Sequence, residues 1–237
     1  MTYGRKFWRT PRNNMNYFIE LLLTVPTVII AIIFHEVAHG FIAYKLGDYT
    51  AKAQGRLSLN PLHHIDILGA LSFLFFKFGW AKPVPINTYN FKKPKRDMAL
   101  SALAGPVANV LLALVGCFLY SLSLSLLADV WFESMNFAYK LCSAWLLFIR
   151  NFAWLNLSLA VFNLIPLPPL DGSRIFLVFL PDRLYFKVMR YEREISIVFI
   201  LLLFADSRFL GGYISYGLSS VVNFVFNAMM SLFSLIF

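Results

Sequence analysis

The sequence predicts an all-α polytopic membrane protein with about five to six transmembrane helices around a metal site. Of its 237 residues, 59% are hydrophobic and 14% are charged, whereas soluble domains are typically about half apolar and a quarter charged. Several apolar runs approach the ~20 residues that a helix needs to cross a bilayer. The first of these runs contains the pattern H-E-x-x-H at His35–His39, which predicts that metal chemistry takes place within the membrane.

The N-terminal part of the chain predicts a tail, a span and a loop. Residues 1–16 are polar and basic, which favours an irregular tail. Residues 17–46 form the first predicted span. Residues 47–66 predict a polar loop, because Gly47-Asp48 and Asn60-Pro61 are turn signals.

A membrane-associated segment that does not cross the bilayer is predicted near 67–90. The apolar run 67–81 is short and interrupted, which is more typical of a re-entrant or interfacial segment than of a span. Pro83 and Pro85 exclude helix after it and favour extended backbone. We therefore expect a re-entrant or β-hairpin-like segment at this point of the chain.

The second half of the chain predicts four further apolar helices. Residues 98–127 and 141–165 are long apolar runs that predict two spans. A short helix is expected over 173–180. The last two apolar segments cover 195–205 and 213–237, and the first of these reaches a spanning length only if its helix begins several residues earlier.

The distribution of charge predicts the orientation. The formal net charge is +9, and the cations lie mostly in loops beside apolar runs, so topology explains them better than a nucleic-acid partner does. With five spans, the basic loops 45–96 and 182–194 fall on one side, which the positive-inside rule assigns to the cytoplasm. Cys117 and Cys142 lack metal-ligand spacing and are expected to be packing residues.

The pattern at the start of the chain predicts a zinc site. His35 and His39 lie four residues apart, so one helix face carries both imidazoles to one ion, and Glu36 is placed to move a proton of water. Zinc hydrolases use three protein ligands and a water. Asp171 is the favoured third ligand, since it follows a proline-broken stretch and precedes Gly172; its alternative role is a helix N-cap. The other candidates are Asp66, His63 and His64.

Three segments of the chain together resemble the signature of the site-2 protease family, which are intramembrane zinc metalloproteases. The matching segments are His35–Gly40, Gly105–Asn109 and Asn163–Gly172. The stretches from Gly47 to Asp66 and from Gly79 to Pro85 resemble the short prokaryotic branch, which has no PDZ or nucleotide-sensing domain.

The resemblance implies a role for each matching residue. One Zn²⁺ per chain would be bound by His35, His39 and Asp171, with Glu36 as the general base. Asn163 would hold the substrate backbone or the developing oxyanion. His64 is not assigned as a ligand and is expected to be a solvated loop residue. Asn109 would be a packing or backbone-binding residue, with an interhelical hydrogen bond as the alternative.

The resemblance also implies an activity and a domain organisation. The substrates would be single-span membrane proteins, cleaved within or near their transmembrane helices. Separately, strand addition of an unwound substrate is a hypothesis for Gly79–Asn87, with a plain membrane-surface loop as the alternative. The catalytic membrane core would cover 17–182, with C-terminal transmembrane helices over 183–237. The cell membrane is the expected location, with the active site towards the cytoplasm.

Two other functions fit parts of the same pattern. Intramembrane histidines and carboxylates also occur in metal-ion transporters, although no internal repeat is present in this sequence. An inactive homologue that binds membrane partners would retain the fold without the chemistry. Glu36 between the two histidines favours the protease over both alternatives.

Overall fold

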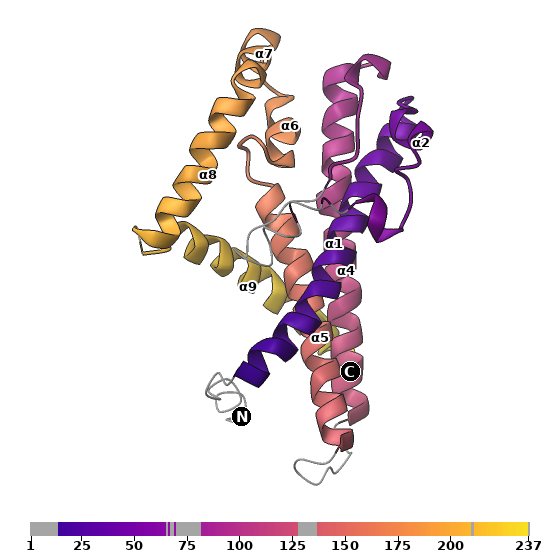
Figure 1. Cartoon of the computed structure of the whole chain (residues 1–237), viewed down its shortest axis with the longest axis vertical. Coiled ribbons are helices and arrows are strands. Elements are labelled where there is room, and N and C mark those ends of the chain that lie inside the picture. Colours follow the sequence, from indigo (N-terminus) through magenta and orange to yellow (C-terminus); the bar gives the residue numbers. More distant parts are fainter. Residues whose placement is uncertain are drawn as a thin grey trace.

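The protein is all-helical in the part that the structure describes. This computed structural model describes residues 14–64, 66, 69, 82–127, 137–209 and 211–236, and it contains no strand among them. Figure 1 shows the helices as an elongated bundle. The helical elements are α1 (Asn14–Lys45), α2 (Thr50–Ala53), η2 (Pro61–His63), η3 (Thr88–Asn90), α4 (Pro94–Leu127), α5 (Phe137–Asn163), α6 (Asp171–Leu177), α7 (Asp182–Arg190), α8 (Glu192–Arg208) and α9 (Tyr213–Phe233).

Four helices are long and apolar enough to cross a membrane. They are the Leu22–Lys45 part of α1, together with α4, α5 and α9. Helix α8 begins at Glu192, earlier than its apolar run, but its 17 residues extend only ~25 Å at ~1.5 Å per residue, less than the ~30 Å hydrocarbon core. Four of the five to six predicted spans are therefore found among the described residues.

Two expectations concern segments that the structure covers only in part. Most of the segment near 67–90 and residues 1–13 of the expected tail lie outside the described residues, while residues 14–16 belong to α1 and are not irregular. Within that segment, residues 82–87 are neither helix nor strand, and η3 follows them. The expected non-helical backbone after Pro83 is therefore present, while a hairpin stays a prediction.

Small side chains allow the central helices to pack closely. Helix α4 lies along both α1 and α5 (Figure 1). A Cβ atom added at Gly116 of α4 would come within 2.8 Å of the Cβ of Ala153 on α5, so glycine at this position permits the close approach that stabilises helix pairs in lipid. Cys117 is a free, buried member of this interface. Its predicted role as a packing residue is confirmed.

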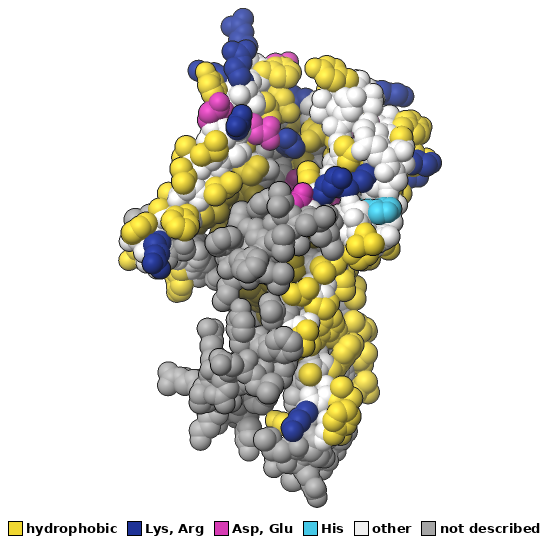
Figure 2. Space-filling model, viewed as in Figure 1, with side chains coloured by type: hydrophobic (Ala, Val, Ile, Leu, Met, Phe, Trp, Pro, Cys, Tyr) yellow, Lys and Arg dark blue, Asp and Glu magenta, His cyan; other side chains and the backbone are white. Residues whose placement is uncertain are grey.

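The outer surface separates apolar and charged regions along the long axis. Figure 2 shows hydrophobic side chains over the long helices, while Lys and Arg gather mainly at the end that carries α2, α6 and α7. Exposed apolar side chains include Leu111 on α4 and Phe224 on α9. An apolar surface of this extent suits contact with lipid rather than water.

Asp48 joins two parts of the chain at the charged end. Its buried carboxylate accepts hydrogen bonds from the backbone N–H of Thr50 at 3.1 Å and of Asn87 at 2.7 Å. The side-chain amide of Asn90 donates to it at 2.7 Å. These bonds fasten the segment before α4 to the end of α1. Burial alone would raise the pKa of Asp48, but the hydrogen bonds from Thr50, Asn90 and Asn87 lower it below its usual value.

Candidate active site

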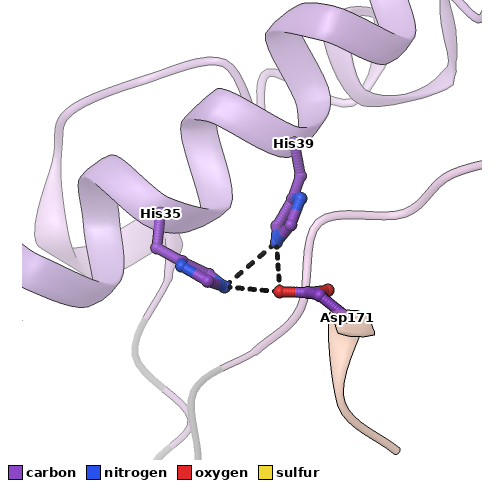
Figure 3. Close-up of side chains that lie close together, drawn as sticks. All are labelled: His35, His39 and Asp171. Carbon is purple, nitrogen blue, oxygen red and sulfur yellow. Dashed lines mark hydrogen bonds and ion pairs between the residues drawn. The ribbon is translucent and has the colours of Figure 1, made fainter. Parts of the chain in front are cut away.

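The two histidines of the H-E-x-x-H pattern lie on one face of α1, as their spacing predicts. Both side chains are buried, and their Nε2 atoms are 3.0 Å apart. Figure 3 shows the two rings pointing into the same space. A helix that is buried at this point therefore presents two nitrogen ligands to one ion.

Asp171 completes the cluster from the first residue of α6. Its Oδ2 atom lies 3.1 Å from Nε2 of His35 and 3.2 Å from Nε2 of His39 (Figure 3). The alternative role as an N-cap is not observed, because Leu170 occupies the N-cap position. Among the described residues, these three side chains form the group that could hold a metal ion.

The other candidate third ligands are engaged elsewhere. His63 contacts the carbonyl of Gly55, and Asp66 accepts a hydrogen bond from a nearby backbone N–H. His64 is buried, with Nε2 2.7 Å from the carbonyl oxygen of Ser58. The expectation of a solvated His64 is therefore wrong, because the loop folds over this ring instead of exposing it.

The hydrogen bonds made by Nδ1 of each ring leave its Nε2 atom unprotonated, with a free lone pair. Nδ1 of His39 is 2.8 Å from the carbonyl oxygen of Ser101, which can only accept, so Nδ1 carries the proton. Nδ1 of His35 is 2.5 Å from Oδ1 of Asn109, and the Nδ2 group of Asn109 donates to Ala31. Nδ1 of His35 is therefore also the donor, which fixes the tautomer that binds metals through Nε2.

A cation fits the cluster that these tautomers create. The two Nε2 lone pairs and the Oδ2 atom of Asp171 face one another, and that oxygen is buried without a hydrogen bond from any described residue. Three electron-rich atoms at this distance repel unless a positive charge lies between them. Two nitrogen ligands of a tetrahedral zinc ion lie ~3.3 Å apart, close to the separations in this site. The donor set therefore fits zinc.

Asn109 connects the metal cluster to all three central helices. Besides its contact with His35, its Nδ2 group donates to the carbonyl of Ala31 at 3.1 Å and to Oδ1 of Asn156 at 2.9 Å. The interhelical hydrogen bond proposed from the sequence is confirmed. Asn156 was not selected from the sequence, although an amide within a predicted span is a signal for such a role.

Two glycines permit close contacts at the site, Gly105 to the cluster and Gly172 to the backbone before α6. A Cβ atom at Gly105 would lie 2.4 Å from Nε2 of His39 and 2.6 Å from Cε1 of His35. Gly105 therefore permits the close packing of α4 against the two imidazoles. A Cβ atom at Gly172 would lie 2.3 Å from the carbonyl oxygen of Ile165. Gly172 serves close backbone contact between the chain after α5 and α6. It does not have the positive φ of a sharp turn.

The two predicted catalytic side chains have different surroundings. Oε2 of Glu36 accepts a hydrogen bond of 2.8 Å from the backbone N–H of Val84, a partner that sequence reasoning did not identify. Asn163 is the last residue of α5, and its Nδ2 group donates to the carbonyl of Leu159 in the same helix. The described contacts of Asn163 do not include the metal cluster.

An apolar crevice lies between the long helices, and its lining comes within one helical turn of His35. Its volume is about 490 Å³, and it is lined by residues of α1, α5, α8 and α9. Ala31 and Ile32 lie one turn before His35 in α1, and Phe162 lies next to Asn163 in α5. The crevice therefore approaches the cluster from the apolar part of the protein.

A cluster that could hold a metal, with two ligands on a bilayer-length helix and the third on the short helix α6, indicates a class, the multi-pass membrane metalloenzymes. Comparison with known proteins identifies the family within this class. The chain belongs to Peptidase family M50, whose sequence pattern matches residues 23–205. It is a zinc metalloendopeptidase, and His35, His39 and Asp171 could form its metal site.

Curated relatives extend along most of the chain. YwhC of Bacillus subtilis, named as a zinc metalloprotease, is 39% identical over 213 residues, covering 90% of this chain and 91% of its own length. Two others bear the same class name at 28% identity. Rip2 of Mycolicibacterium smegmatis aligns over 67% of this chain and 57% of its own length. A Methanocaldococcus jannaschii protein aligns over 70% and 73%. No solved structure matches the chain.

Proposed function

We propose that this metalloendopeptidase cleaves single-span membrane proteins within or near their transmembrane helices. The observation that supports this substrate class is the position of the cluster. His35 and His39 are buried in the Leu22–Lys45 stretch of α1, which is long and apolar enough to cross a bilayer. A peptide bond must therefore come to the membrane to be cleaved.

The proposed reaction uses the bound metal and the side chains of Glu36 and Asn163. When bound by His35, His39 and Asp171, zinc supplies Lewis acidity and lowers the pKa of water to ~7. The Glu36 carboxylate accepts the proton of the attacking water and then delivers it to the leaving amine. The Asn163 amide donates to the oxygen of the scissile carbonyl as negative charge develops there.

The apolar crevice is the proposed approach for the substrate helix. Its lining from α1 and α5 leads to the turns that carry His35 and Asn163. The alternative approach, strand addition at Gly79–Asn87, has little support in the described part of that segment. Pro83 and Pro85 have no N–H, and the N–H of Val84 is already bonded to Glu36.

The active site is proposed to face the cytoplasm. Helix α6, which carries Asp171, lies at the end of the molecule where Lys and Arg side chains gather. Since cytoplasmic loops carry the excess of these residues, that end is placed inside the cell. Water and products then exchange with the cytoplasm.

The test compares wild type with Glu36→Gln on a single-span test substrate in detergent. Removing a general base reduces turnover by about 10²–10⁴-fold, and zinc content is expected to remain near that of wild type. Asp171→Ala is the complementary variant, and its zinc content is expected to fall. Equal cleavage by wild type and Glu36→Gln contradicts the proposed chemistry, and unchanged zinc in Asp171→Ala contradicts the third ligand.

A further inference from the structure

Arg56 is a buried cation that binds backbone carbonyls. Its Nη2 atom donates to the carbonyl of Lys82 at 2.6 Å and to that of Pro83 at 2.9 Å, and its Nη1 atom donates to the carbonyl of His63. No carboxylate pairs with it in the described part of the chain. Burying a guanidinium without an opposite charge is costly. This cost is best explained by a specific role for the planar guanidinium of Arg56, which binds several carbonyls at once.

The guanidinium of Arg56 holds Lys82, Pro83 and Val84 against the loop before them. Lys82 is fixed from both sides, because its N–H donates to the carbonyl of His64 at 2.8 Å while its own carbonyl accepts from Arg56. Pro83 adds a second carbonyl bond to the same guanidinium. The position of Val84, the next residue, is therefore set by bonds to its two predecessors.

Val84 has the single backbone donor in this stretch. Pro83 and Pro85 lack an N–H, so only Val84 can donate between Lys82 and Ile86. Its N–H bonds Oε2 of Glu36 at 2.8 Å. Within the segment that Arg56 holds, Val84 thus donates its N–H to the carboxylate of Glu36, which lies between the two histidine ligands in the sequence.

Gly40 provides the space for this contact on α1. It lies one helical turn after Glu36, and a Cβ atom there would come within 2.8 Å of Cγ1 of Val84 and 2.7 Å of Cδ2 of Leu57. Any larger residue would displace these two side chains and so disturb the packing of Val84 against α1. Two separate features therefore support the hydrogen bond between Val84 and Glu36. One is the space at Gly40 of α1. The other is the Arg56 clamp, formed by the bonds of Arg56 to Lys82 and Pro83.

We propose that Arg56 is a positioning residue for Glu36, acting through the Val84 N–H. With Oε2 held by Val84, the Oε1 atom is directed to the water that loses its proton, and the side chain does not sample other rotamers. Arg56 itself contacts neither substrate nor metal. The inference rests on the proposed role of Glu36 as the general base.

The contact can be tested without any cleavage assay. Hydrogen–deuterium exchange in the segment 82–86 reports three amides, because its two prolines have none. In the full-length zinc-loaded protein, Arg56→Lys is expected to raise exchange in this segment about tenfold or more, since one ammonium cannot replace the fork. Lys52→Gln, which removes an exposed cation bonded to Tyr44, serves as the matched control and is expected to change nothing.

Kinetics then decide whether the contact positions Glu36. Arg56→Lys is expected to lower kcat by about ten- to a hundredfold with little change in KM or zinc content. Val84→Pro removes the donor while leaving the bonds of Arg56 intact, and it is expected to lower kcat similarly. Val84→Pro therefore tests the contact even where the Arg56→Lys variant does not fold.

Each possible result has a defined meaning. Faster exchange with unchanged kcat in Arg56→Lys, or unchanged kcat in Val84→Pro, overturns the positioning role. Unchanged exchange in Arg56→Lys overturns the clamp itself. If the wild type cleaves no substrate, the proposed function fails, but the exchange comparison between Arg56→Lys and Lys52→Gln still decides the clamp.

Discussion

Asn109 gives the metal cluster its orientation at the scale of single residues. One amide fixes the tautomer of His35 and bonds Asn156 of α5. Partners of this kind typically contribute 10–100-fold to metal affinity. We expect Asn109→Ala to weaken zinc binding by about that factor in chelator competition. Asn223→Ala, which removes an amide bonded to Trp154 far along the chain, is the control and should keep wild-type affinity.

Gly105 offers a second residue-scale prediction, based on space. In Gly105→Ala, the added methyl group would overlap both imidazoles, at 2.4 Å from Nε2 of His39. We expect the zinc content of the purified variant to fall well below one ion per chain. Gly217→Ala is the control, because nothing lies within 4 Å of its added Cβ. Full zinc occupancy in Gly105→Ala would show that the rings can move aside.

The three side chains of the cluster were predictable from the sequence, whereas Asn156 and the backbone groups at the site were not. His35, His39 and Asp171 carry chemistry that no apolar helix needs, so their spacing and setting were informative. The carbonyl of Ser101 and the N–H of Val84 also define the site. Every residue has such groups, so the sequence alone gives no reason to select these two.

At the scale of elements, hydropathy located the long helices better than the short ones. The runs 98–127 and 141–165 correspond to α4 and α5. Helix α7 was not predicted, because its charges and aromatic residues alternate along the chain. On a helix with 3.6 residues per turn, Arg183, Lys187 and Arg190 share one side. The pattern is therefore amphipathic only once the helical period is applied.

The junction at Asp48 provides an element-scale prediction. Its lowered pKa means that its hydrogen bonds stabilise the fold above the ordinary pKa of ~3.8 and are lost as pH falls through the lower, folded value. We expect Asp48→Asn to lower the free energy of unfolding at pH 7 by ~1–3 kcal/mol, measured as a lower Tm. The deficit relative to wild type should shrink in acid.

The control for Asp48 is another carboxylate at the same end of the molecule. Asp182 is largely exposed and pairs with Lys95 at 3.1 Å. Exposed ion pairs contribute little, so Asp182→Asn should leave Tm almost unchanged. A deficit in Asp48→Asn that persists unaltered in acid would contradict the assigned hydrogen bonds.

At the scale of the whole molecule, the orientation in the membrane is open to direct test. Tyr89 is 94% exposed near the charged end, and Phe137 is 81% exposed at the start of α5. The element η3, which carries Tyr89, packs on α4, whose first turns lie at the charged end, whereas the start of α5 lies at the other end of the bundle (Figure 1). With Cys142 replaced by serine, we expect an impermeant maleimide to label Tyr89→Cys only in inverted vesicles. Phe137→Cys should be labelled only in intact cells, and the reverse pattern would place the active site outside.

The wide separation of the metal ligands along the chain has a consequence for biosynthesis. His35 and His39 lie in α1, the first of the bilayer-length helices, while Asp171 comes after α5. A chain that has been inserted only as far as α4 has both imidazoles but no carboxylate ligand. We therefore expect the peptidase to be inactive during its own membrane insertion until α6, which carries Asp171, has been synthesised.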